Sequence, residues 1–518
     1  MIIASATFIS RLVGLLRDRI FAHYYGANQI MDAYYAAFKI PDLIYNLLIL
    51  GALSAGFIPI FTKLFEKDKN KAWEMSNNII NIVGLFLIII CFFGAIFTPL
   101  FAKYIAPGFE QNGIQLVIEF TRIMFLSPIF LGISMIFGGI LQSRRQFLIY
   151  SFAPIFYNLG IIFGVIWLTA WIGTNGLAWG VVLGAFLHLI IQKIGAYYSG
   201  WRWQPIINFK DQDLKIITKL MIPRTLGLAI SQLNIIVLTI LASLLPIGSI
   251  AVYNYANNLQ GVATGIIGIP FALSVFPILS KYAAIQDKEK FIENLSQTIR
   301  KILFLIIPAS ILILLLRAQI VRVVLGTGEF DWSATINTAN ALAFFTMGLF
   351  AQSLIPLMAR AFYSLENTKI PFYTALISEL ITIIFALILM KPMGVSGLAL
   401  AVSIGSIINL LSLSISLKNT IGFINGENIL KATYKISIAG IFMGCTIQFL
   451  KYPLAKFFNL DYFYGVFGQG LTAGIIGLAV YMVLCYIFKL EEYIEFQKSF
   501  KKKFLRIKGL PEEAELGN

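Results

Sequence analysis

The first apolar stretch of the chain contains a cluster of charged residues. Arg11, Arg17, Asp18 and Arg19 lie between residues 1 and 25, and a helix of that length can cross a bilayer. A charge near the bilayer centre costs roughly 2.5–3.5 kcal/mol on insertion scales, so such residues normally face a protein interior or a wet cavity. Charged positions of this kind mark the path of a substrate or an ion, and they are the first candidates for a functional site.

The spacing of these residues predicts that they line a cavity. Arg11 and Asp18 are seven residues apart and share one face of a helix, while Ser10 and Arg17 share the adjoining face. A broad polar wedge on one side is typical of a helix that lines a cavity rather than one that faces lipid. Arg19 lies farther round the helix, where a long side chain can reach the membrane interface.

The composition indicates a membrane protein with many spans. Of the 518 residues, 58% are hydrophobic and 13% are charged, whereas a soluble protein has about 25% charged residues. The three cysteines lie in apolar segments and the two histidines are far apart, so neither residue type predicts a metal site or a disulfide framework. The sequence also lacks a nucleotide-binding loop, a serine triad pattern and a zinc-protease motif.

Apolar runs bounded by polar, Gly or Pro residues predict an all-α polytopic fold of about fourteen transmembrane helices. Their expected limits are 1–25, 29–61, 76–102, 114–141, 147–172, 176–197, 216–245, 249–280, 302–325, 334–362, 371–391, 395–417, 433–450 and 463–488. Lys and Arg gather in every second loop, so the positive-inside rule predicts a cytoplasmic location for both termini. This distribution accounts for most of the net charge of +15 and argues against a nucleic-acid partner.

Two short internal matches predict a duplicated architecture. Residues 176–184 (GLAWGVVLG) match residues 397–405 (GLALAVSIG) at an offset of 221, and Pro59 and Pro277 lie in similar segments at an offset of 218. These offsets indicate two homologous halves of six spans each. An even number of spans makes the halves parallel, and substrate sites of such proteins lie near mid-membrane between them, which favours a transporter.

Several short motifs occur along nearly the whole chain. They are SRLVGLLRD (10–18), YGA (25–27), MDAY (31–34), AFKIP (37–41), GALS (51–54), APGF (106–109), QSRRQF (142–147), the segment 153–158, the segment 276–280, AFYS (361–364) and NTKIP (367–371). In order and spacing they resemble the MurJ/MviN lipid II flippases of the multidrug/oligosaccharidyl-lipid/polysaccharide exporter superfamily.

The resemblance implies a transporter rather than an enzyme. Its substrate would be lipid II, the undecaprenyl-pyrophosphate-linked MurNAc-pentapeptide-GlcNAc, moved from the inner to the outer leaflet of the bacterial cytoplasmic membrane for cell wall biogenesis and cell shape. Lipid II and membrane lipids are thus the expected partners. We expect two lobes around a central cavity, over 1–200 and 201–425, then two spans over 426–490 that offer a lipid-tail groove, and a basic cytoplasmic tail over 491–518.

A lipid-linked pyrophosphate needs fixed cations in a cavity of low dielectric, where charge-assisted hydrogen bonds are strong. Arginine suits this task because its planar fork holds phosphate oxygens in a defined geometry. The residues expected to bind the substrate are Ser10, Arg11, Arg17, Asn46, Asn257 and Asn258. The alternative is an Arg–Asp pair that closes the two lobes without touching a ligand.

Three further residues are expected to gate the cavity or orient its cations. Asp18 would repel phosphate, so we expect it to orient the arginines. Asp32 resembles a family carboxylate that pairs across the lobes, with a helix N-cap role as the alternative. Lys39 lies three residues before Asp42, a spacing that permits either a local ion pair or a functional role.

The chain departs from the family pattern at two places. The second span usually carries a further arginine and often a glutamate, but residues 43–50 contain neither. The eighth span carries Asn257 and Asn258 where an arginine is usual. Either these amides suffice with Asn46, or the head group of the substrate differs in charge or sugar.

Other functions fit less well. Those departures leave open a relative that exports another polyprenyl-linked glycan, whereas a cation-coupled small-molecule exporter would need an acidic cavity. A membrane glycosyltransferase would need a large acidic outer loop, and no expected outer loop exceeds roughly 15 residues. No cofactor or metal is expected. Transport is expected to couple to membrane potential or to a monovalent cation, although Glu379 is the lone carboxylate in the segments that hold sodium in some relatives.

Overall fold

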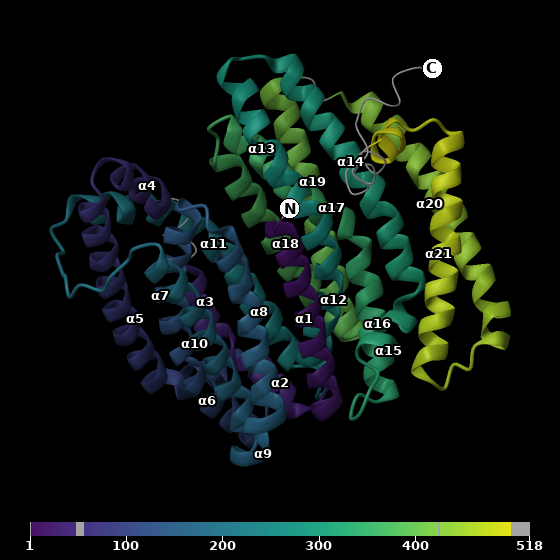
Figure 1. Ribbon diagram of the computed structural model, residues 1–518. Helices are drawn as coiled ribbons and strands as arrows, with labels where there is room; N and C mark the ends of the chain where they lie inside the picture. The colour runs from purple at the N-terminus through teal and green to yellow at the C-terminus, as the bar shows by residue number, and fades with distance from the viewer. Residues whose placement is uncertain (1, 48–55, 423–424, 499–518) are drawn as a thin grey trace. The chain divides into compact units, whose positions relative to one another are not determined.

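The computed structural model describes residues 2–47, 56–422 and 425–498, which are helical with no β-strand among them (Figure 1). The helices of the first half are α1 (Ile2–Tyr25), α2 (Gln29–Ala37), α3 (Lys39–Tyr45), α4 (Ile58–Lys67), α5 (Lys69–Ile105), α6 (Gln111–Met124), α7 (Leu126–Ser143), α8 (Phe147–Phe163), α9 (Thr169–Ile172), α10 (Asn175–Tyr198) and α11 (Gln212–Ser243). Those of the second half are α12 (Ser249–Ala263), α13 (Ile269–Ala284), α14 (Lys288–Leu315), α15 (Arg317–Val324), α16 (Trp332–Met347), α17 (Leu349–Ser364), α18 (Lys369–Met393), α19 (Val395–Ile421), α20 (Gly426–Phe457) and α21 (Phe463–Ile487).

The expected all-α polytopic fold is confirmed. Ten helical segments in the described residues are long and apolar enough to cross a membrane, and the bent pair α16–α17 makes up to eleven. Each overlaps one of the fourteen predicted spans, but the span predicted over 302–325 is wrong in its bounds, because α14 covers Lys288–Leu315 and the separate helix α15 covers Arg317–Val324. Two of the helical segments contain a short π-helical turn. Gly164–Leu168 joins α8 to α9, and Thr264–Gly268 joins α12 to α13.

The other three predicted spans contain helices in their described residues. The first is α1, whose apolar run is interrupted by the four charges between Arg11 and Arg19. The second, 29–61, is divided into α2, α3 and α4, and residues 48–55 lie outside the described part of the chain. The third falls on α11, which includes the apolar segment Ala229–Ser243.

The chain divides into two compact units, each built from several stretches of sequence. Unit 1 comprises Met1–Asn258, Val324–Ala341 and Ala375–Ala401. Unit 2 comprises Leu259–Val323, Leu342–Thr374 and Val402–Asn518. The lobes, the lipid-tail groove and the cytoplasmic tail expected from the sequence stay predictions.

In unit 1, α1 packs along α8, and α8 packs along α10 (Figure 1). Glycines make the second of these contacts close. A Cβ atom added to Gly184 of α10 would lie 2.3 Å from the carbonyl oxygen of Tyr157 in α8, and one added to Gly160 would lie 2.3 Å from the Cα of Gly184. Small residues of this kind let helix backbones approach closely where lipid provides no hydrophobic driving force. The α8–α10 pair therefore forms a rigid support for α1.

In unit 2, α20 and α21 run side by side and pack against α14 (Figure 1). Their shared core includes the fully buried Ile447 and Cys485 and the nearly buried Tyr481. The Tyr481 hydroxyl donates a hydrogen bond of 2.8 Å to the carbonyl of Phe304 in α14. This bond satisfies the one polar group that Tyr481 brings into an otherwise apolar contact.

The close α8–α10 contact generates a stability prediction. Gly184→Ala is expected to lower the stability of the protein by about 1–3 kcal/mol, because the added methyl group meets the backbone of α8. Gly14→Ala in α1 is the matched control, since nothing lies within 4 Å of the added atom and alanine is about 1 kcal/mol better than glycine inside a helix. Thermal unfolding midpoints of the purified chain in detergent test this, and equal shifts for both variants would contradict it.

Candidate functional site: a buried charge cluster on the first helix

Arg17 and Asp18 form an ion pair on α1. Both Nε and Nη2 of Arg17 donate to Oδ1 of Asp18, at 3.1 and 2.8 Å. The Asp18 side chain is 3% exposed and the Arg17 side chain is 21% exposed. A buried carboxylate needs such a partner, because removing two opposite charges from water is tolerated when good geometry and further hydrogen bonds compensate them. Asp18 therefore contacts an arginine, as the sequence predicts, whereas its gating or orienting role stays a prediction.

Two asparagines from distant helices complete the cluster. Asn158 of α8 accepts a hydrogen bond of 3.1 Å from Nη1 of Arg17, and its own amide donates to the carbonyl of Pro154. Asn258 of α12 donates a bond of 2.9 Å to Oδ2 of Asp18. Both carboxylate oxygens of Asp18 are thus occupied, and the cluster joins α1, α8 and α12 within unit 1.

Aromatic rings near the cluster lower its local polarity. The Arg17 guanidinium lies 5.8 Å from the centre of the Phe21 ring, which packs edge-on against Tyr34 at 5.0 Å between centroids. Tyr35 and Tyr255 form a second edge-on pair at 5.9 Å. Phe21 and Tyr255 are fully buried. A cation in such surroundings interacts more strongly with an anion than it would in water.

Ser10 and Arg11 lie two turns before the ion pair, towards the start of α1, and both are half-buried. Arg11 is in none of the ion pairs of the described residues. Among the carboxylates that the structure describes, none lies within contact distance to balance the positive charge of Arg11.

Asp32 binds the beginning of α12. Its Oδ2 accepts a hydrogen bond of 2.6 Å from the backbone N–H of Gly248, and its Oδ1 accepts one of 2.8 Å from Ala251. Its own helix is capped instead by Asn28. Gly248 has a φ of +90°, and a Cβ there would lie 2.3 Å from the carbonyl oxygen of Ala27. Asp32 thus caps a helix more than 200 residues away in sequence rather than its own.

The remaining predicted residues are Lys39, Asn46 and Asn257. Lys39 and Asp42 attract each other along α3, but no direct ion pair joins them in the described part of the chain. Asn46 follows α3, and its backbone N–H bonds to the carbonyls of Asp42 and Leu43. Asn257 is half-buried beside Asn258. The roles assigned to these residues stay predictions.

Asn158 was not among the predicted site residues. The available signal was a lone amide within the apolar segment 147–163, four residues after Pro154. A polar residue at membrane depth is a candidate for function, but sequence does not reveal which side of its helix faces Arg17.

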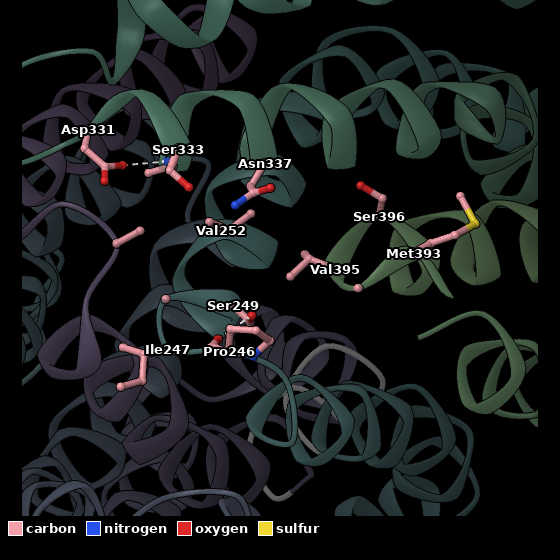
Figure 2. Close-up of a pocket in the computed structure, with 14 residues that line it drawn as sticks. Pro246, Ile247, Ser249, Val252, Asp331, Ser333, Asn337, Met393, Val395 and Ser396 are labelled. Carbon is pink, nitrogen blue, oxygen red and sulfur yellow. Dashed lines mark hydrogen bonds between the residues drawn. The ribbon is translucent and has the colours of Figure 1, made fainter. Parts of the chain in front are cut away.

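A separate pocket of unit 1 is shown in Figure 2, with a volume of about 260 Å³. It is lined by the ends of several helices, including Ser249, Asn337 and Ser396, and by Asp331, which caps α16 through the N–H of Ala334 at 2.6 Å. None of its lining residues is Lys or Arg, so it is unsuited to a phosphate group. The described residues also contain no group of three or more His, Cys, Asp or Glu that could hold a metal ion.

The fold and the cluster define a multi-pass helical membrane protein with charge buried in its first helix, and comparison with known proteins identifies its class. A transporter of the multidrug resistance MATE family in an inward-facing conformation superposes with a TM-score of 0.68 at 16% identity, over 80% of this chain and 96% of that one. A lipid II flippase MurJ structure in an inward closed conformation gives a TM-score of 0.78 at 25% identity, over 94% and 98% of the two chains. The fold is therefore that of a membrane transporter.

The family follows from sequence comparison. A family model described as lipid II flippase MurJ matches residues 21–468. The probable lipid II flippase MurJ of Buchnera aphidicola subsp. Baizongia pistaciae is 31% identical over 445 residues, 84% of this chain and 86% of that protein. The lipid II flippase MurJ of Burkholderia cenocepacia is 26% identical over 425 residues, 80% and 82% of the two chains. The chain belongs to the lipid II flippase MurJ family.

The ion pair generates a second prediction. Asp18→Asn is expected to lower stability by about 2 kcal/mol, because it leaves the partly buried Arg17 cation without its carboxylate. Adding Arg17→Gln should recover part of that loss, since both charges are then gone. A double-mutant cycle of thermal unfolding measures the coupling, expected at roughly 0.5–3 kcal/mol, and additive effects of the two substitutions would refute the pairing.

Proposed function

We propose that this chain is a lipid II flippase, which moves a lipid-linked peptidoglycan precursor from the cytoplasmic to the outer leaflet of the bacterial cytoplasmic membrane. The observation that carries the proposal is the family match over residues 21–468. The chemistry of α1 supports it, because an arginine pair in an apolar helix suits a substrate whose transported end bears a pyrophosphate. The protein contributes binding and movement in this proposal, and no covalent step.

Arg11 and Arg17 have different parts in this proposal. Arg17 uses three of its five N–H groups on Asp18 and Asn158, so its fork is already oriented and two donors are left for a ligand. Arg11 has no carboxylate partner in the described ranges of the chain and supplies net positive charge. Ser10, Asn46, Asn257 and Asn258 would add neutral hydrogen-bonding groups around the phosphates or sugars.

The movement we propose is alternating access, in which the binding cavity opens to one side of the membrane at a time. Asp18, Asp32 and Lys39 would act as gating or orienting residues. Asp32 holds the start of α12 through two backbone N–H groups, and such bonds must re-form after each cycle if α12 moves relative to α2. Membrane potential is the proposed energy source, since moving one charge through 100 mV yields about 2.3 kcal/mol; a coupled monovalent cation is the alternative.

The topology proposed with this function places both termini in the cytoplasm. Its support is the gathering of Lys and Arg in alternate loops. Reporter fusions at the two ends, one active in the cytoplasm and one active outside it, test this orientation directly.

The second candidate is export of another polyprenyl-linked glycan. It is favoured by the amides at Asn46, Asn257 and Asn258, which stand where the family pattern has further charge. A head group with less negative charge would need fewer cations. The two candidates share the fold and the binding helix and differ only in substrate.

The decisive experiment is rescue of bacteria depleted of their own lipid II flippase. We expect expression of this chain to restore growth and the amount of lipid II accessible on the outer leaflet, measured by an externally added enzyme that modifies it. Failure to rescue, in cells where the chain is verified in the membrane, would refute the lipid II assignment and leave the second candidate.

Within a rescuing strain, Arg17→Ala is expected to reduce flipping roughly ten- to hundredfold, the effect of losing a charged hydrogen-bond donor. Arg11→Ala should reduce it at least as much. Lys103→Ala, an exposed cation near the end of α5, is the matched control and should retain wild-type flipping. Full activity of both arginine variants would rule out their proposed role in binding.

A further inference from the structure

Two cations meet at the end of α14 in unit 2. Arg317, the first residue of α15, donates through Nη1 to the carbonyl of Leu314 at 2.9 Å. Lys451 of α20 donates through Nζ to the carbonyl of Leu315 at 3.0 Å. These carbonyls belong to the last turn of α14, where a helix has its negative end and attracts cations. The two side chains are thereby brought to one place from segments 134 residues apart.

Polar side chains of α15 and α21 hold this arrangement in position. The Gln319 amide donates a bond of 3.0 Å to the side-chain oxygen of Gln469, whose amide donates one of 2.8 Å to the carbonyl of Lys451. Gln469 is 4% exposed. Gly470 and Gly474 let α21 approach closely, because added Cβ atoms would lie 3.3 Å from Gln319 and 3.5 Å from Leu316. The cations are therefore fixed by a buried network and not by chance surface contacts.

No acidic side chain among the described residues forms an ion pair with either of these cations. In the part of the chain that the structure describes, neither Arg317 nor Lys451 is in an ion pair. The two cations repel each other, and Arg317 uses one of its five N–H groups on Leu314. One cation is enough to interact with the carbonyl groups at the end of α14. The second positive charge and the remaining N–H groups of Arg317 therefore suit the binding of an anion.

The surroundings indicate which kind of anion. Large aromatic side chains at the same ends of α20 and α21 are exposed, including Tyr452 (71%), Phe457 (83%) and Tyr464 (64%). Exposed Tyr side chains at the end of a membrane helix typically lie at the level of lipid head groups. Both cations are half-buried, which reduces their hydration and strengthens contact with a phosphate oxygen.

We propose that Arg317 and Lys451 form a binding site for the phosphate of an anionic phospholipid head group, in the leaflet where α14 ends. Basic pockets between membrane helices bind anionic head groups in this way. In the orientation proposed above this is the outer leaflet, but the site does not depend on that orientation or on the substrate transported. The bound lipid would neutralise the pair and hold α15 against α20.

Native mass spectrometry of the full-length chain tests the site. The protein is titrated with equimolar phosphatidylglycerol and phosphatidylcholine of identical acyl chains, and the bound fraction of each is measured. We expect preferential retention of phosphatidylglycerol. The double variant Arg317→Gln/Lys451→Gln is expected to lose that preference by about thirtyfold, which corresponds to about 2 kcal/mol. Unchanged preference in this variant would overturn the proposal.

Three controls separate the site from general effects. Lys456→Gln removes an exposed cation from the last turn of α20 and should leave the preference unchanged; an equal loss would mean that any surface charge suffices. The swap Arg317→Lys/Lys451→Arg retains both charges and should keep most of the preference, which distinguishes lost charge from misfolding. Inorganic phosphate in excess should not displace the lipid, and displacement would show a site for free anions instead.

Discussion

The arrangement around the first helix depends on the hydrogen bonds that the Asp18 carboxylate accepts. A charge in an apolar helix is tolerated only when partners compensate it. Here one oxygen of Asp18 accepts from Arg17 and the other accepts from Asn258. Arg17 in turn reaches Asn158. One pair of adjacent charges thus ties α1 to α8 and to α12, and the α8–α10 glycine contact gives that tie a rigid base.

A second buried carboxylate, that of Asp32, also binds α12. Asp32 of α2 binds the N–H groups of Gly248 and Ala251 at its beginning, while Asp18 of α1 binds Asn258 further along. Charge-assisted hydrogen bonds of this type contribute roughly 1.5–3 kcal/mol each. If α12 moves relative to α1 and α2 during transport, Asp32 loses both of its backbone N–H donors and Asp18 loses Asn258, although Asp18 keeps Arg17 on its own helix. The carboxylates therefore oppose such movement unless a ligand or water replaces the lost bonds.

The sequence was sufficient for the fold class and for the position of the cluster, because apolar length and misplaced charge are local signals. It was also sufficient for the association of Arg17 with Asp18, which are adjacent. The contacts of Asn158, Asn258 and Gly248 could not be predicted, since each depends on how helices far apart in sequence pack. The second predicted span, 29–61, was drawn as one helix, although polar residues and Pro41 accompany its division into α2 and α3.

The pairing of Arg17 alters what each arginine can do for a pyrophosphate. Together with Asp18 it has no net charge, so it offers oriented N–H groups rather than a field that attracts anions. Arg11 has no carboxylate partner among the described residues and is the stronger source of attraction. A doubly charged group that approaches Arg17 also meets Asp18, and the repulsion is smallest when Asn258 continues to bind the carboxylate. Asn258 would then assist binding by shielding Asp18, a role that differs from direct contact with substrate and that an arginine at the same position would perform more strongly.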